Sequence, residues 1–435
     1  MRAIPLTPSL LNVLVDAVLA NASLVNALAA LMVVVPLGCS AARDASTPGD
    51  PTTDTDPIPD PPDTHGPGDG GPRDDAGGGL DDVAVTPTSD FDHDGYDVGD
   101  DCDDGNPLIN PGAIEVPGDG VDNDCNGATD EALVDCDHDL SLTSTDAMDF
   151  ARALGLCRTT RADAKGKERT WGVIRAALTT SDGSGKPLPR QFGIEPSWGS
   201  AVLPRAGASM VALSNGVART PGQPGYAPLP KGTDSTTNAN NAPSGWPRNT
   251  KGCPSSSTKK AFDSVVLDLV IRVPTNAKSF SYDLDFYSSE YVEYVCQAYN
   301  DSYVALLTSK TKMDPATAGN ISFDASGDPI NVNSGFFQAC SPDSWLGRSF
   351  TCPLGVTELA GTGFDAIASS LTKPAQNGAT SWLRTTQAIV AGEDIELKLM
   401  IWNTGDHWLP STILLDRFVW SADPTTGSTT DRPPR

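Results

Sequence analysis

The stretch SVVLDLVIRVPTNAKSFSYDLDF, residues 264–286, decides the fold. Apolar and polar residues alternate in both of its halves, which is the period of a half-buried strand and not that of a helix. Similar runs recur between turns rich in Gly, Pro, Asn and Asp, at 302–308, 319–323, 395–402 and 413–420. Short strands in this arrangement predict a mostly β protein with a jelly-roll-like β-sandwich.

One short helix is expected ahead of these strands, at residues 144–155. Ser and Thr residues followed by Asp146 favour a helix start, the apolar face ends at Leu154, and Gly155 stops the helix. Residues 220–260 are rich in Pro, Asn, Ser and Gly, so we expect a long surface loop there.

The charge of the chain is concentrated near its N-terminus. Its 56 Asp and Glu residues outnumber the 30 Lys and Arg residues, which gives a net charge of −26. Thirty of the acids lie between residues 40 and 150, where only Arg43 and Arg73 are basic. This balance lacks the basic footprint of a nucleic-acid-binding protein, so no nucleic acid partner is expected. An acidic run of this kind either stays extended in solvent or collects cations.

The first 38 residues predict an export signal peptide. They contain one basic residue, Arg2, and an apolar stretch from Leu24 to Leu37 that is too short and too near the terminus for a spanning helix. Gly38 directly precedes Cys39 at the end of that stretch, which resembles a bacterial lipobox. The resemblance implies a mature protein that begins at Cys39 and is held on the membrane by lipid on that sulfur. A cleaved soluble signal and an uncleaved anchor remain as alternatives.

The segment after Cys39 has the composition of a linker. Residues 39–89 consist largely of Pro, Gly, Asp and Thr, with almost no apolar side chains. Such a segment buries too little apolar surface to offset the conformational entropy that folding would cost. We therefore expect a disordered acidic tether. Residues 423–435 are likewise expected to form a disordered tail. Because that tail is not hydrophobic, we expect Cys39 to be the anchor.

Two acidic loops lie between the tether and the strands. Residues 90–101 read DFDHDGYDVGDD and match a calcium-loop pattern that ends in Asp in place of Glu. In that pattern alternate residues point oxygen atoms at one ion, so the expected ligands are Asp90, Asp92, Asp94, the carbonyl of Tyr96, and Asp101. No helical pattern flanks the loop, which argues against a helix–loop–helix sensor.

The second loop, DNDCNGATDE at residues 122–131, is incomplete by itself. Its candidate ligands are Asp122, Asp124, Asn126, Asp130 and Glu131. Leu133 stands at the twelfth position and cannot bind an ion. We therefore expect this loop to borrow a carboxylate from Asp101 or Asp103.

Cysteine usage fits export. Eight cysteines follow Cys39, an even number that permits four disulfides. Nearness in the sequence predicts the pairs Cys102–Cys125 and Cys136–Cys157. The pairing of the other four is left open: Cys253, Cys296, Cys340 and Cys352. The chain has no CxxC, so zinc-ribbon and thioredoxin-like interpretations are weak.

Residues 90–131 resemble the protein metal-binding site, or MopE-type motif, which is common in secreted myxobacterial proteins. The resemblance is carried by DHDGY at 92–96, DCDDGNP at 101–107, NPGAIE at 110–115 and DGVDNDCNG at 119–127. The family name implies copper. The residues favour Ca²⁺ instead, because His93 is the only imidazole among oxygen ligands and copper prefers nitrogen and sulfur.

Residues from about 135 to 422 resemble the choice-of-anchor L domain, which occurs in surface-anchored or secreted bacterial proteins. The resemblance is carried by LGLC at 154–157, WGVI at 171–174, FYSSEY at 286–291, YNDSY at 299–303, GATSWL at 378–383 and LLDRFVW at 414–420. Within it, Glu290, Asn300 and Asp301 are the best candidate site, for a second Ca²⁺ or a sugar hydroxyl. The alternative is a turn at Asn300-Asp301 beside a surface acid.

No GxSxG, HExxH, P-loop or GxGxxG stretch appears, and no motif selects a carboxylate pair for glycoside hydrolysis. We therefore expect a non-catalytic, lipid-anchored protein of the outer membrane surface. It would carry a calcium-binding module at 90–134 and a β-sandwich at 135–422 that recognises an extracellular glycan or protein. The alternatives are a secreted carbohydrate-active enzyme with a calcium-binding accessory region, and a copper-binding surface protein.

Overall fold

The computed structural model describes residues 89–228, 239–253, 259–345, 347–365, 377–405 and 407–434. All of these residues belong to one compact unit, Asp81–Arg435. The expected signal peptide, Cys39 and the tether up to residue 88 therefore lie outside the described residues. Within the described ranges, no helix has the length and apolar character needed to cross a membrane.

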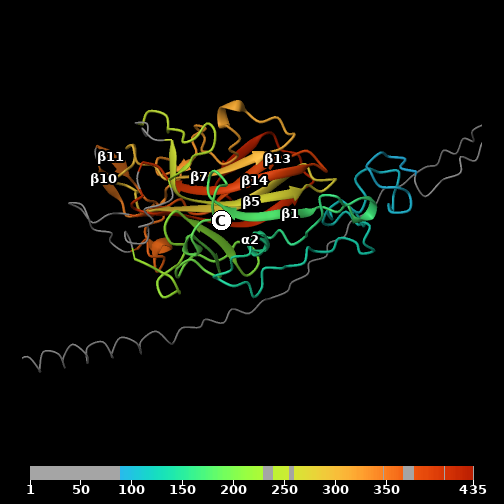
Figure 1. Cartoon of the computed structure of the whole chain (residues 1–435), viewed down its shortest axis with the longest axis horizontal. Helices are drawn as coiled ribbons and strands as arrows, with labels where there is room; N and C mark the ends of the chain where they lie inside the picture. The colour runs from blue at the N-terminus through green and yellow to red at the C-terminus, as the bar shows by residue number, and fades with distance from the viewer. Residues whose placement is uncertain are drawn as a thin grey trace, which may run out of the picture. The chain divides into compact units, whose positions relative to one another are not determined.

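Two antiparallel sheets form a β-sandwich, as the strand pattern predicts (Figure 1). The six-stranded sheet has the order β1-β5-β14-β7-β8, with β4 paired to β5. Its strands are β1 (Gly172–Thr179), β4 (Ala239–Asn241), β5 (Lys260–Arg272), β7 (Ser302–Thr308), β8 (Ile330–Asn331) and β14 (Asp394–Asn403).

The eight-stranded sheet has the order β16-β13-β6-β15-β3-β2. In addition, β12 pairs with β6 and with β9. Its strands are β2 (Phe192–Glu195), β3 (Met210–Ser214), β6 (Ser279–Ser288), β9 (Ala339–Cys340), β12 (Gly378–Ala379), β13 (Leu383–Ala388), β15 (Ser411–Ser421) and β16 (Ser428–Asp431). A separate ribbon pairs β10 (Asp343–Trp345) with β11 (Arg348–Phe350).

The main core lies between the two sheets. Val265, Leu267 and Leu269 of β5 share one buried cluster with Leu284 and Phe286 of β6. The spacing of two is the one that residues 264–286 predict, because every second side chain of a strand points to the same face. Burying each of these side chains stabilises the fold by about 1.5–3 kcal/mol.

Loops cover the outer faces of both sheets, because the residues between the core positions are also apolar. Val266 of β5 and Trp402 of β14 pack with Trp246 on the outside of the six-stranded sheet. Tyr287 of β6 packs with Trp198 on the outside of the other sheet. The central strands are therefore buried on both sides, which holds the sandwich rigid beneath its loops.

The described residues contain one α-helix, α2 (Ala147–Ala153), which lies beside β1 in Figure 1. Asp146 caps it by accepting a hydrogen bond from the Met148 amide at 3.0 Å. Gly155 has φ +91°, a left-handed conformation that suits glycine and ends the helix. The Phe150 ring packs against the Phe192 ring of β2, with centroids 5.6 Å apart.

Two expectations about strands are wrong. Part of the tail is ordered, because Ser428–Asp431 form β16 and pair with β13. Residues 319–323 form only isolated bridges. There the Asn320 side chain accepts a hydrogen bond from the Ala305 amide at 2.9 Å, so a side chain takes the place of a strand partner. The expected loop at 220–260 also contains the short strand β4.

Four disulfides connect the described residues. Cys102 is bonded to Cys125 and Cys136 to Cys157, the two pairs that nearness in the sequence predicts. The four cysteines left open pair as Cys253–Cys296 and Cys340–Cys352.

Glu195, the last residue of β2, is a buried acid. One carboxylate oxygen accepts a hydrogen bond from Gln223 at 2.6 Å, and the other is buried without a partner. Burial raises the pKa of Glu195 to about 7, against the lowering effects of Gln223 and Arg219. The pKa of Glu195 in the folded state thus lies above its ordinary value of 4.5. The neutral carboxyl therefore contributes its full stabilisation below pH 4.5. That contribution is lost as the pH rises through 7, where the buried carboxyl must ionise.

We expect Glu195→Gln to remove this pH dependence, because glutamine keeps the shape and cannot ionise. Between pH 4.5 and pH 8 the native chain should lose about 3 kcal/mol more of its free energy of unfolding than the variant loses. Urea unfolding at both pH values measures the difference. Glu396→Gln, on the half-exposed surface of β14, is the control, and equal pH profiles for the Glu195 variant and the native chain would contradict the expectation.

Candidate metal centre

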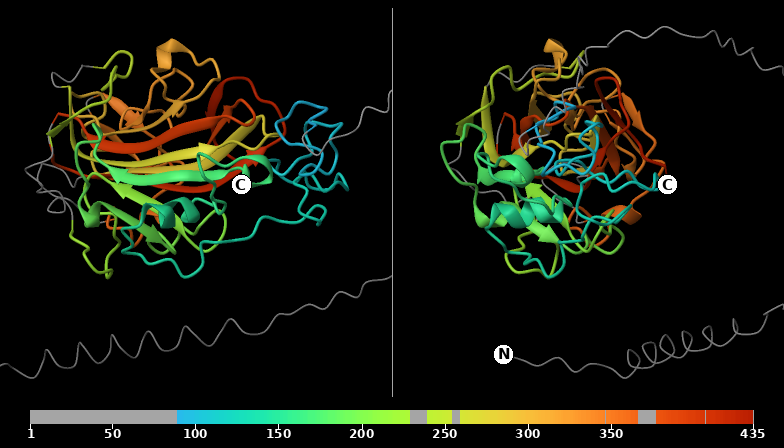
Figure 2. Two further views of the ribbon diagram at one scale, coloured as in Figure 1. Left: turned by 45° about the vertical axis from the view of Figure 1, so that its right-hand side comes forward. Right: turned by 90° about the vertical axis from the view of Figure 1, so that its right-hand side faces the viewer.

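Five carboxylates of the first acidic loop converge at one end of the sandwich. Together they make up the first carboxylate group, which consists of two triads that share Asp92. The triads are Asp90, Asp92 and Asp104, and Asp92, Asp94 and Asp101; within each triad the ligand atoms lie within 4.8 Å of one another. The loops that carry them lie past the start of β1 in Figure 1 and in the left view of Figure 2.

Backbone amides hold three of these carboxylates by one oxygen only. Oδ1 of Asp92 accepts from the Asp94 amide at 3.2 Å, and Oδ1 of Asp101 accepts from the Asp103 amide at 2.8 Å. Oδ1 of Asp104 accepts from the Phe91 amide at 3.2 Å, which ties the two ends of the loop together. The loop therefore fixes the direction of these three side chains without using their second oxygens. Asp90 and Asp94 differ, because both oxygens of each accept hydrogen bonds.

The second oxygens of Asp92, Asp101 and Asp104 are buried and have no hydrogen-bond partner. Asp101 is only 9% exposed, and burial raises its pKa to about 6; burial raises the pKa of Asp94 as well. Unpaired carboxylate oxygens that face one another away from water are costly unless a cation lies between them. None of the ion pairs among the described residues supplies one to these five acids.

The structure adds one member to this group. Asp104 belongs to it and Asp103 does not, because the turn at residues 103–106 points the later side chain inward. Tyr96 is fully buried and donates from its hydroxyl to the Arg169 carbonyl at 2.5 Å; its own carbonyl as a ligand stays a prediction. Sequence spacing did not single out Asp104, although it adjoins the predicted Asp103.

A second group consists of Glu115, Asp124 and Glu131. Oδ1 of Asp124 and Oε2 of Glu131 are buried without a partner, and Asp124 is 7% exposed. Unlike the first group, this one has a protein cation, because Arg158 lies 3.0 Å from Asp124. Burial nonetheless raises the pKa of Asp124. The second group is therefore the weaker candidate for a metal ion.

Glu115 completes the second group, and the expected borrowing from Asp101 or Asp103 does not occur. Glu115 is held by the amides of Asn123 and Asp124, at 2.8 and 3.1 Å. It lies in the NPGAIE stretch, several residues before the loop, so spacing within the loop could not indicate it.

The other predicted members of the second loop have different partners. Asp122 accepts from the amides of Asn126 and Gly127, and Asp130 accepts from those of Gly118 and Gly120. The Asn126 side chain donates to Glu131. Asp122 and Asp130 thus stabilise turns, whereas Asn126 orients a carboxylate of the group.

The module is joined to the sandwich by buried hydrogen bonds. Trp171 Nε1 donates to the Ala113 carbonyl at 2.8 Å. Asn276 accepts from the Ile114 amide at 2.9 Å and donates to the Ile114 carbonyl at 2.7 Å. Tyr96 adds its bond to Arg169. Order in the module is therefore coupled to the end of the body where β1 begins.

We expect replacement of Cys102 and Cys125 by serine to weaken both the fold and metal binding. The bond closes a loop of 23 residues and joins the two acidic segments. Its loss should lower the free energy of unfolding by about 3 kcal/mol. The control is the Cys253–Cys296 pair, outside both carboxylate groups, whose replacement should lower stability and leave metal affinity unchanged. Equal metal affinity in the Cys102/Cys125 variant and the native chain would contradict the link between the bond and the site.

The predicted site at Glu290, Asn300 and Asp301 is interior. Glu290 is 2% exposed and Asp301 is fully buried. Asp301 accepts from Asn215 at 2.7 Å, and the Asn403 amide, with its nitrogen toward Asp301, reaches both oxygens at 2.5 and 2.9 Å. Burial argues against a sugar hydroxyl at this place, and against a surface acid at Glu290; a second Ca²⁺ there stays a prediction.

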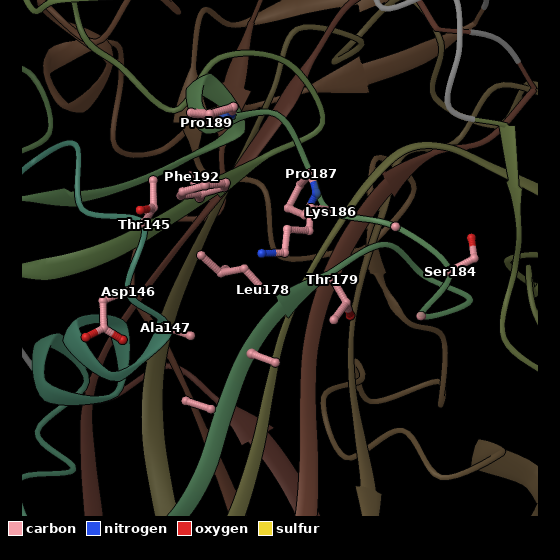
Figure 3. A pocket seen from close by; sticks show the side chains of 14 residues that line it. Thr145, Asp146, Ala147, Leu178, Thr179, Ser184, Lys186, Pro187, Pro189 and Phe192 are labelled. Atoms are coloured by element: carbon pink, nitrogen blue, oxygen red, sulfur yellow. The ribbon is translucent and has the colours of Figure 1, made fainter.

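Two cavities outside the acidic loops are lined by charged side chains. A cavity of about 770 Å³ lies between α2, β1 and residues 183–192, and its charged lining residues are Asp146 and Lys186 (Figure 3). Asp146 already caps α2, so this cavity offers no acid–base pair.

Asp285 and Glu358 form a carboxyl pair, and Glu358 lines a cavity of about 480 Å³ beside Trp382. Burial raises the pKa of Asp285 well above its usual range, and the charge of Glu358 raises it further. Asp285 is fully buried, whereas a glycosidase needs both carboxyls to flank the bond of a bound sugar. This pair does not support the glycosidase alternative.

Comparison with known families agrees with both resemblances carried by the sequence. Residues 101–131 match the family model named for copper binding by MopE and described as a metal-binding motif. Residues 204–418 match the choice-of-anchor L domain. No curated protein and no solved structure matches the chain. The two matches indicate a surface-associated protein with a metal-binding motif, and the larger domain is of a non-enzymatic surface type.

Proposed function

We propose that the chain is a calcium-binding, lipid-anchored cell-surface protein whose β-sandwich recognises a ligand outside the cell. The observation that carries the proposal is the set of unpaired, buried oxygens of Asp92, Asp101 and Asp104. Together with Asp90 and Asp94 they offer oxygen atoms from five carboxylates. Ca²⁺ takes six to eight oxygen ligands, so these acids and a few waters or carbonyls would complete its shell.

The donor chemistry favours Ca²⁺ over copper. Both carboxylate groups contain only oxygen, and His93 belongs to neither. The sulfurs of Cys102 and Cys125, which lie beside Asp101, are bonded to each other and cannot bind a soft ion as thiolates. Copper prefers imidazole and sulfur ligands, and neither carboxylate group contains one.

Calorimetric titration of the EDTA-stripped chain with Ca²⁺ tests the ion. We expect dissociation constants of about 10⁻⁴–10⁻³ M, as in other extracellular modules. Asp101→Asn should weaken Ca²⁺ binding at the first carboxylate group by about tenfold or more. Loss of a residue that merely supports a metal ligand already weakens metal binding by about that factor. Asp97→Asn, in the same loop but outside both groups, is the matched control. Copper bound at one equivalent and not displaced by millimolar Ca²⁺ would overturn the proposal.

Attachment through Cys39 is the second part of the proposal. Four disulfides and a surface-type domain support export, where both the bonds and millimolar Ca²⁺ persist. The membrane fraction of cells that express the native chain should contain it, whereas Cys39→Ala should release it. Equal partition of the two chains would contradict lipid attachment.

Recognition of a glycan or protein by the sandwich is the third part. A choice-of-anchor L match supports a surface role, and Asp285 of the carboxyl pair is buried away from any bound sugar. A glycan screen read for both retention and product release separates the proposals. Retention without turnover supports recognition, and product release would support the carbohydrate-active alternative.

A further inference from the structure

Asp137 lies outside the calcium module and is held in an unusual way. One oxygen, Oδ2, accepts hydrogen bonds from the amides of Ala208 and Ser209, at 2.8 and 2.7 Å, and from the Ser209 hydroxyl at 3.3 Å. Gly207 passes so close that a Cβ there would lie 2.4 Å from the same oxygen. The other oxygen, Oδ1, is buried without a hydrogen-bond donor, and the residue is 5% exposed.

Two more potential ligands face Asp137 from its own segment. The carboxylate of Asp135 accepts a hydrogen bond from the Asp137 amide at 3.4 Å. Nε2 of His138 lies 3.2 Å from Asp135 Oδ2. One ligand atom from each of the three residues lies within 4.8 Å of the other two. The disulfide from Cys136 to Cys157 anchors this segment to the residues that follow α2.

The backbone fixes Asp137 through Oδ2, and a carboxylate oxygen of Asp135 lies within 4.8 Å of one of Asp137. Two carboxylates at this separation repel each other unless a proton or a metal ion lies between them. His138 adds an imidazole at the open side, where its side chain is 64% exposed and that of Asp135 is 47% exposed. One imidazole with two carboxylates suits zinc or another divalent transition metal better than calcium.

We propose that Asp135, Asp137 and His138 bind a divalent transition-metal ion of the zinc class, separate from the all-oxygen calcium module. Asp137 is the buried ligand, and the other two close the site from solvent, where water fills the remaining positions. The ion clamps residues 135–138 to the turn at 207–209, directly before β3, because Asp137 holds that turn through its other oxygen.

The test uses the full chain, stripped with EDTA and then kept in millimolar Ca²⁺ so that the oxygen groups are filled. Titration with Zn²⁺ should show one equivalent bound. His138→Ala and Asp135→Asn should each weaken that binding by about tenfold or more. His65→Ala, the same replacement in the acidic stretch outside the described residues, is the control and should bind Zn²⁺ as the native chain does.

A second readout separates loss of the ligand from loss of the fold. Asp135 and His138 are both well exposed, so the variants should match the native chain in thermal unfolding when Zn²⁺ is absent. Zn²⁺ should raise the unfolding temperature of the native chain and not that of the variants. If a shared proton alone joins the carboxyls, the native chain will show no Zn²⁺ site, or both variants will bind with native affinity; either result overturns the proposal.

Discussion

Removal of Ca²⁺ is expected to lower the free energy of unfolding of the whole chain by about 1–3 kcal/mol for each occupied site. This range follows from mass action for an ion at ten to a hundred times its dissociation constant. The effect should reach the sandwich as well as the module. Tyr96, Ile114 and Trp171 are buried at their junction, and they lose their support when the acidic loops repel one another.

Urea unfolding in 10 mM CaCl₂ and in EDTA, followed by tryptophan fluorescence, measures this loss. Asp101→Asn should show a smaller difference between the two conditions, because one of the buried unpaired oxygens is replaced by an amide that has its own donors. Asp97→Asn should respond as the native chain does. If the native chain unfolds identically in calcium and EDTA, the carboxylates of the module do not hold Ca²⁺.

Replacing Asp283 by alanine is expected to lower the free energy of unfolding by about 3–5 kcal/mol. Asp283 is fully buried in β6 and pairs with two arginines. Its oxygens lie 2.6 and 3.0 Å from Nε and Nη2 of Arg384 on the neighbouring β13, and 3.2 Å from Nε of Arg205. The substitution leaves both guanidinium groups partly buried without this partner, and burying an unpaired charge is costly.

Guanidinium chloride unfolding of Asp283→Ala measures that cost. Asp163→Ala provides the contrast, because Asp163 pairs with Arg161 on the open surface, where both side chains are mostly exposed. Surface ion pairs contribute little, so this variant should keep the native midpoint. Similar midpoints for the two variants would show that the buried network contributes no more than a surface pair.

Strands with alternating apolar residues could be predicted, and strands without them could not. Residues 264–286 and 413–420 carry the period of two and form β5, β6 and β15. β16 reads Ser-Thr-Thr-Asp and has no apolar signal; it joins β13 through backbone pairing and through a hydroxyl contact between Thr430 and Thr385 at 3.0 Å. Such pairing depends on where the partner strand lies, which local sequence does not specify.

The same limit applies to the candidate metal centre. The loop spacing indicated Asp90, Asp92, Asp94 and Asp101, which share one short turn. Glu115 reaches the second group from another segment because the Asn123 and Asp124 amides bind its carboxylate. Carboxylates brought together by a fold between segments have no fixed spacing, so a loop pattern cannot find them.

The short C-terminal strand has a consequence for handling the protein. β16 is the last strand beside β13, so its loss would expose a row of unpaired amides and carbonyls along Leu383–Ala388. An uncovered sheet edge is a template for strand addition by another molecule. Truncations that end before Ser428 would therefore invite self-association, and a purification tag is better joined through a polar spacer after β16.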